Sequence, residues 1–135
     1  MDALVAVEQL RRFFEARPDG VVCVYLFGST ARGSAGAGSD VDVGVLLDHD
    51  PPATLEGSGV RLEGELERQL GARVDLVLLN RAPVDLIHRV LKDGILVFDR
   101  APLERIRFEV RARNAWFDLK PILDRYRRSG GSVRG

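Results

Sequence analysis

The stretch from Leu26-Phe27-Gly28-Ser29 to Ser39-Asp40-Val41-Asp42 decides how this chain folds. It joins an apolar strand, predicted over Val21–Phe27, to a second strand through a Gly-Ser turn and a loop of small residues. Because a strand repeats every two residues, the carboxylates of Asp40 and Asp42 leave the same face, about 7 Å apart along the backbone. The opposite face of the second strand is predicted to be buried, and it consists of Val41, Val43, Val45 and Leu47.

Two carboxylates on one strand face repel each other unless a cation or a proton lies between them. Magnesium prefers oxygen ligands and shares its remaining positions with water and substrate phosphates. A third acid, Asp75, is the only acid in the apolar run 73–79, which predicts another strand. If that strand is a neighbour, about 4.8 Å away, Asp75 reaches the same ions. We therefore predict that Asp40, Asp42 and Asp75 bind two magnesium ions and act in catalysis.

The turn at Gly28 and Ser29 predicts a phosphate site. Glycine lets a ligand approach the backbone closely, and the Ser29 hydroxyl and the amides that follow it suit an anion. A short helix starting within 30–33 would add a favourable dipole at its N-terminus, and Arg32 would place a guanidinium near the phosphates. A Gly-Ser turn also occurs in ordinary hairpins, and Asp-x-Asp also occurs on solvent-facing strands, so each motif alone is weak.

Taken together and in this order, the motifs resemble those of the DNA polymerase β-type nucleotidyltransferase superfamily. Gly-Ser-Thr-Ala-Arg-Gly at 28–33, followed by Ser-Asp-Val-Asp at 39–42, resembles its minimal nucleotidyltransferase (MNT) branch. The resemblance implies an α/β (α+β) fold with a mixed sheet of about four strands packed by helices, and a long C-terminal helix. It also implies ATP as substrate, two Mg²⁺ ions, and a nucleotide site formed by Gly28, Ser29, Thr30, Arg32 and Ser39.

The resemblance further implies a function. MNT proteins are antitoxins that transfer AMP from ATP to a tyrosine of a HEPN-family ribonuclease toxin, so a hetero-oligomer with such a toxin is expected. Two alternatives stay open. One is a small-molecule nucleotidyltransferase of the aminoglycoside type, although little chain follows residue 100 to build an acceptor domain. The other is a non-catalytic antitoxin that neutralises its partner by binding alone.

The composition indicates one domain over residues 1–128, because 135 residues suit a single core and are too few for a polymerase with separate subdomains. Residues 1–99 contain 10 basic and 16 acidic side chains, and residues 100–135 contain 10 basic and 4 acidic ones. The single cysteine, Cys23, excludes an internal disulfide and suits a reducing cytoplasm. No apolar run reaches the ~20 residues of a membrane span.

The remaining elements follow from periodicity and from breaking residues. Helices are predicted over 2–17, from a start within 54–60 to 70, and over 84–92, and a short strand over 95–98. The acids Glu63, Glu65 and Glu67 are predicted to form a solvated helix face. His49, between two acids and before two prolines, is predicted to be a solvated loop residue rather than a metal ligand.

The segment 101–128 predicts a long helix whose apolar face is wider than packing on one sheet requires. Phe108 and Phe117 fall outside a narrow stripe, and Pro121 should kink the helix or restart it. Five residues are candidates for partner contact: Trp116, Phe117, Leu119, Ile122 and Tyr126. We expect the arginines here to be solvated or paired with the acidic body rather than to contact nucleic acid. Residues 129–135 are predicted to be a flexible tail.

Overall fold

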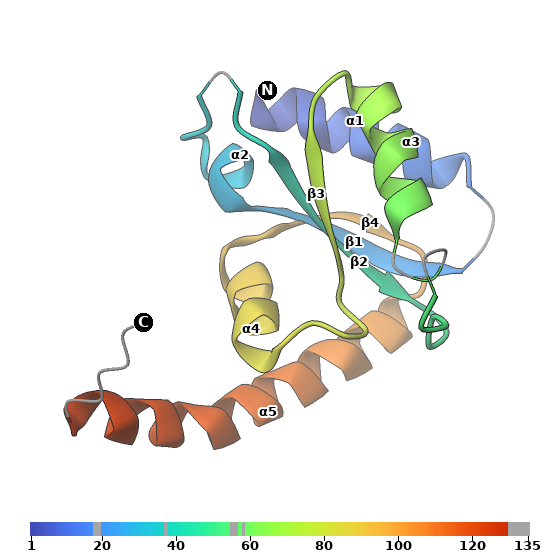
Figure 1. Ribbon diagram of the computed structural model, residues 1–135. Helices are drawn as coiled ribbons and strands as arrows, with labels where there is room; N and C mark the ends of the chain where they lie inside the picture. The colour runs from blue at the N-terminus through green and yellow to red at the C-terminus, as the bar shows by residue number, and fades with distance from the viewer. Residues whose placement is uncertain (18–19, 37, 55–56, 58, 130–135) are drawn as a thin grey trace.

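The computed structural model describes the chain except for residues 18–19, 37, 55–56, 58 and 130–135. The described part contains nine helices and strands, drawn in Figure 1. In chain order they are α1 (Ala3–Glu15), β1 (Val21–Phe27), α2 (Gly28–Arg32), β2 (Val41–Leu47), α3 (Val60–Leu70), β3 (Val74–Leu78), α4 (Val84–Asp93), β4 (Ile95–Asp99) and α5 (Pro102–Arg128). The predicted α+β fold with a mixed four-stranded sheet and a long C-terminal helix is confirmed. None of the described helices is long and apolar enough to cross a membrane.

The sheet has the strand order β3-β2-β1-β4. β1 pairs antiparallel with both β2 and β4, whereas β2 and β3 run parallel. In Figure 1 the helices α1 and α3 lie on one side of the sheet, and α4 and α5 lie on the other. The sequence predicted that the strand with Asp42 and the strand with Asp75 are neighbours in the sheet, and this prediction is confirmed.

Each face of the sheet has its own core. On the first face, side chains of α1 and α3 such as Leu10 and Leu66 pack against Val41, Val43 and Val45 of β2. On the second face, Tyr25 and Leu46 pack with Val90 of α4 and Phe108 of α5. The alternation along β2 thus assigns its odd-numbered valines to the first core, as the sequence predicted, and places Asp42 on the face of α4 and α5.

Several predicted boundaries need correction. α2 begins at Gly28, not at Thr30, and it ends before Gly33, whose φ of 77° lies in the left-handed region that terminates helices. β2 begins at Val41, so Asp40 precedes the strand. Of the range predicted for the start of α3, residues 55, 56 and 58 lie outside the described part. α5 does not restart at Pro121; it is one helix that includes this proline, and Figure 1 shows its axis bending in the C-terminal half.

α5 is attached to the sheet by a polar network as well as by Phe108. The hydroxyl of Tyr25 donates to Glu109 Oε2 at 2.6 Å. Arg105 contacts Asp99 Oδ2 at 2.8 Å and Glu109 Oε1 at 3.1 Å. Burial and the hydrogen bond to Glu109 raise the pKa of Tyr25, so it remains a neutral donor. Phe108 is thus a core residue that fixes the first half of α5, and it does not belong to an excess apolar face.

The sequence predicted that the acids of α3 form a solvated face, and this prediction is wrong. Glu67 accepts a hydrogen bond from the Val74 amide at 3.0 Å, and Glu63 accepts one from the Leu76 amide at 2.9 Å. Glu65 pairs with Arg17 at 3.1 Å. Because β3 is at the edge of the sheet, its outward amides lack a neighbouring strand, and the two carboxylates take the place of that strand.

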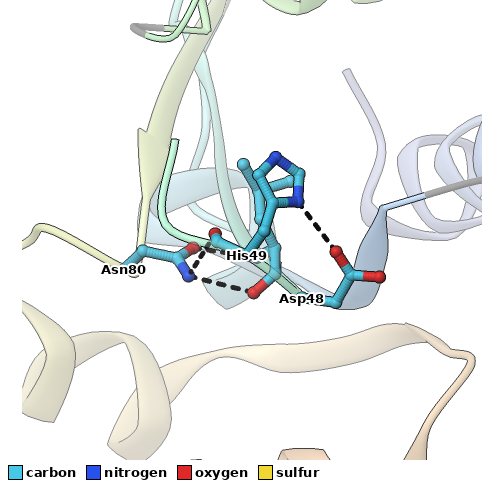
Figure 2. A network of polar contacts seen from close by, with 4 residues as sticks. Asp48, His49 and Asn80 are labelled. Carbon is cyan, nitrogen blue, oxygen red and sulfur yellow. Dashed lines mark hydrogen bonds and ion pairs between the residues drawn. The ribbon is translucent and has the colours of Figure 1, made fainter. Parts of the chain in front are cut away.

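At the other end of the β2–β3 pair, the side chain of Asn80 forms hydrogen bonds with the backbone. Asn80 Oδ1 accepts from the Leu47 amide at 2.8 Å, and Asn80 Nδ2 donates to the Leu47 carbonyl at 2.9 Å and to the His49 carbonyl at 3.3 Å (Figure 2). His49 Nδ1 lies 2.8 Å from Asp48 Oδ1, and its side chain is 56% exposed. His49 is therefore an exposed loop residue, as predicted, whose backbone is held by Asn80.

Replacing Glu63 by alanine should lower the free energy of unfolding by about 1 kcal/mol, because the partly buried Leu76 amide loses a charged acceptor. Glu63→Gln should lose less, since its amide oxygen can still accept. Urea denaturation measures both changes. Arg68→Ala is the matched control on α3, because Arg68 is exposed there; equal stability of the Glu63→Ala and Arg68→Ala proteins would show that Glu63 does not stabilise the edge.

Candidate functional site

The register of the sheet brings three strand positions into one row. Phe27, the last residue of β1, lies opposite Asp42 of β2, and Asp42 lies opposite Asp75 of β3. Paired residues on neighbouring strands point their side chains to the same face. Asp42 and Asp75 are therefore side by side on the face that α4 covers, although they are 33 positions apart in the chain.

Gly28 follows Phe27 and lies directly against Asp42. A Cβ atom at residue 28 would lie 2.0 Å from Asp42 Oδ2, and the φ of Gly28 is 74°. Both the space and the backbone conformation therefore require glycine. The close approach places the first turn of α2, with the amides of Gly28 and Ser29, beside the carboxylate of Asp42.

These residues line one open cavity of about 480 Å³. Sheet residues Asp42, Asp75 and Val77 form one part of its lining, Gly28, Ser29 and Arg32 of α2 form a second, and α4 forms a third. The α4 residues are Leu86, Arg89 and Asp93. A cavity with paired carboxylates, a glycine turn and two guanidinium groups suits a phosphate-containing ligand held together with cations.

The electrostatics of the cavity favour a bound cation. Burial raises the pKa of Asp42 above its ordinary value, and the negative charges of Asp75 and Asp40 raise it further, while the charge of Arg32 opposes them. The protonated form of Asp42 is also favoured by a hydrogen bond with Asp75. A divalent cation between the two carboxylates would remove this repulsion, so the donor set fits Mg²⁺, whose hard charge suits carboxylate oxygens.

Not every predicted site residue lies in this cavity. Asp40 is exposed beside the start of β2, and its Oδ1 lies 3.7 Å from Arg73 Nε. Thr30 is buried, and its hydroxyl has no hydrogen-bond partner in the part of the chain that the structure describes. The Ser39 hydroxyl accepts from the Gly36 amide within the loop, at 3.1 Å. Among the residues that the structure describes, no group of three or more His, Cys, Asp and Glu side chains is arranged to hold a metal ion.

The structure thus brings together Gly28, Ser29, Arg32, Asp42 and Asp75, and it leaves Asp40, Thr30 and Ser39 out of the cavity lining. It adds Leu86, Arg89 and Asp93, which the sequence analysis missed. The sequence feature that could have identified them is their spacing of three and four residues, which puts them on one face of a helix next to the packing residues. Without knowing that α4 lies beside the start of β2, this face could not be distinguished from a solvated one.

The candidate partner residues of α5 divide into two groups. Trp116 stacks on His88 of α4, with ring centroids 4.0 Å apart and an interplanar angle of 7°, so it is held against the body. Phe117, Ile122 and Tyr126 are 60%, 54% and 53% exposed, and Leu119 is partly exposed. The C-terminal half of α5 extends past α4 (Figure 1), so these side chains are available to another protein.

Comparison with known proteins agrees with this site. The family described as polymerase beta nucleotidyltransferase matches residues 8–103. The protein adenylyltransferase MntA of Thermococcus cleftensis is 37% identical over 91 residues, which cover 67% of this chain and 83% of that protein. A solved structure described as a putative minimal nucleotidyltransferase is 39% identical, covers 70% of this chain and 95% of its own, and superposes with a TM-score of 0.53.

More distant solved structures share the fold. A chain of a toxin–antitoxin complex with AMP-PNP superposes with a TM-score of 0.69 at 22% identity, covering 87% of this chain and 95% of that chain. A chain of the complex between a tri-AMPylated HEPN toxin of Shewanella oneidensis and its MNT antitoxin superposes with a TM-score of 0.65 at 20% identity, covering 90% and 96%. The family match over residues 8–103 and the relative at 37% identity show that the chain belongs to the polymerase beta nucleotidyltransferase family and to its minimal branch.

Proposed function

We propose that this protein transfers AMP from ATP to a tyrosine of a HEPN-family toxin and thereby acts as an antitoxin. The observation that supports this most directly is the Asp42–Asp75 pair, held in register beside the glycine turn in a cavity of about 480 Å³. The relative at 37% identity is named a protein adenylyltransferase. Structural neighbours include an MNT antitoxin with an AMPylated HEPN toxin.

In the proposed reaction, the acceptor hydroxyl oxygen bonds to the α-phosphorus of ATP, and the bond from this phosphorus to the bridging oxygen breaks. AMP stays on the acceptor, pyrophosphate leaves, and the hydroxyl proton passes to Asp75. The amides of Gly28 and Ser29 bind the β- and γ-phosphates, with Arg32 beside them. Catalysis then consists mainly of positioning and charge stabilisation.

Asp42 and Asp75 would hold Mg²⁺, which when bound neutralises phosphate charge and polarises the phosphoryl group. Asp40 would join them only by leaving Arg73. That exposed pair, with side chains 83% and 45% accessible, is weak enough to be exchanged at little cost in free energy. The proposed metal set of Asp40, Asp42 and Asp75 therefore requires a movement of one exposed side chain.

A second candidate is neutralisation by docking alone. The exposed apolar side chains on the projecting half of α5 favour a partner surface whether or not nucleotide is transferred.

Asp42→Asn should reduce AMP transfer to the cognate HEPN protein at least about 100-fold, because a metal-binding carboxylate is lost. Labelled ATP, Mg²⁺ and the purified partner measure the transfer. Asp50→Asn is the matched control, since this loop carboxylate is 90% exposed. Labelling equal to the parent's would contradict the assignment of Asp42. If the parent does not label the partner, the proposed enzymatic function is wrong. If Asp42→Asn protects cells from the toxin as well as the parent does, neutralisation by docking alone is favoured.

The raised pKa of Asp42 makes a prediction about stability. Folded protein holds this proton more tightly than unfolded protein, so stability should fall as pH rises from the ordinary carboxyl range, about 4, through the folded-state pKa. Asp42→Asn should therefore melt at a higher temperature than the parent near pH 7 without metal. Mg²⁺ should raise the Tm of the parent and not that of the variant. Thermal melts between about pH 4 and 8 test this, and superimposable profiles for the two proteins would refute it.

The partner surface gives a separate prediction. Ile122 and Tyr126 are one helical turn apart and both exposed. Replacing both by serine should weaken binding to the HEPN protein about 10-fold or more and leave ATP binding unchanged, because large apolar anchors dominate interface energetics. Titration calorimetry measures both affinities. Leu4→Ser on α1 is the control, at 79% exposure; a similar loss for this variant would count against a specific surface on α5.

A further inference from the structure

The third part of the cavity lining, formed by α4, contains a guanidinium that no motif predicted. Leu86, Arg89 and Asp93 are spaced by three and four residues, so they share one face of α4. This face lines the cavity that also contains Asp42 and Asp75. Residues on another face of the same helix, His88, Leu91 and Lys92, line a groove against α5 instead.

Arg89 has no ion pair or hydrogen bond with any residue that the structure describes. Asp85 and Asp93 are four residues away on either side, at the spacing that forms ion pairs on helices. Elsewhere such partners are used: Arg105 contacts Glu109 at 3.1 Å, and Lys120 contacts Asp124 at 2.7 Å. Arg89 is thus an available guanidinium at the cavity.

The charges of the cavity indicate what Arg89 would bind. Three carboxylates, those of Asp42, Asp75 and Asp93, face two guanidiniums, those of Arg32 and Arg89. Once cations neutralise the acid pair, the guanidiniums attract an anion. The planar fork of arginine matches two phosphate oxygens at once, which the point charge of lysine cannot do.

We infer that Arg89 binds the β- and γ-phosphates of the nucleotide from α4, while the amides of Gly28 and Ser29 bind them from α2. This inference rests on the proposed function, because it requires a nucleoside triphosphate in this cavity. It assigns α4 a direct part in substrate binding, whereas the family motifs lie on α2, β2 and β3.

The test compares two ligands that differ in these phosphates. Calorimetry with Mg²⁺ measures the Kd of AMP-PNP and of AMP for the parent, Arg89→Ala, Arg89→Lys and Lys92→Ala. Arg89→Ala should bind AMP-PNP about 10-fold more weakly and AMP within about twofold of the parent, since a charge-assisted hydrogen-bond pair is lost only for the longer ligand. Arg89→Lys should lie between the parent and Arg89→Ala. Lys92→Ala, a cation on the same helix outside the cavity lining, should match the parent.

Two results would overturn the inference on a parent protein that binds AMP-PNP. One is an equal loss for AMP and AMP-PNP, which would place Arg89 at the nucleoside or in a structural role. The other is an Arg89→Ala protein with the affinities of Lys92→Ala. A parent that does not bind AMP-PNP would instead disprove the proposed function, and the inference with it, before any variant is compared. Since Arg89 is exposed, its variants should retain the parent's Tm.

Discussion

The repulsion between the carboxylates of Asp42 and Asp75 is the constraint on which this structure depends. Their strands pair in register, so the two side chains cannot separate without breaking the parallel ladder between β2 and β3. Valines on the other face of β2 hold that strand in the core beneath α1 and α3. Gly28 leaves the space that the Asp42 carboxylate occupies. The fold therefore holds the acid pair in place, and a bound cation would neutralise its charge.

Much of this arrangement could be predicted from the sequence, because it follows from local periodicity. The strands around Asp42 and Asp75 are apolar runs of the right length, and the glycine turn is a conformational requirement that the sequence states directly. What could not be predicted depends on which elements meet. Glu63 and Glu67 resemble a solvated face until β3 is known to be an unpaired edge. Arg89 resembles an ordinary surface residue until α4 is placed beside the start of β2.

The orientation of single side chains was the second feature that could not be predicted from the sequence. A two-residue spacing predicts that Asp40 joins Asp42, but that rule holds only inside a strand, and β2 begins at Val41. Thr30 follows the glycine turn directly, yet the helical rotation of α2 points it into the body, where it is buried. Likewise Trp116 belongs to the apolar set of α5, but the stack on His88 places it against α4. Position in a motif therefore identified the cavity, and which motif residues line it depended on where each element begins.

The helix α4 links the two functions proposed for the chain. One of its faces completes the cavity with Arg89, and another packs against α5 through His88 and Trp116. The half of α5 beyond this contact projects from the body and presents its apolar side chains to solvent. A protein bound there would be held by residues that have no part in the acid pair, the glycine turn or the core clusters. Docking can therefore be weakened without loss of ATP binding, and the acid pair can be altered without loss of docking, since no residue of one is required to build the other.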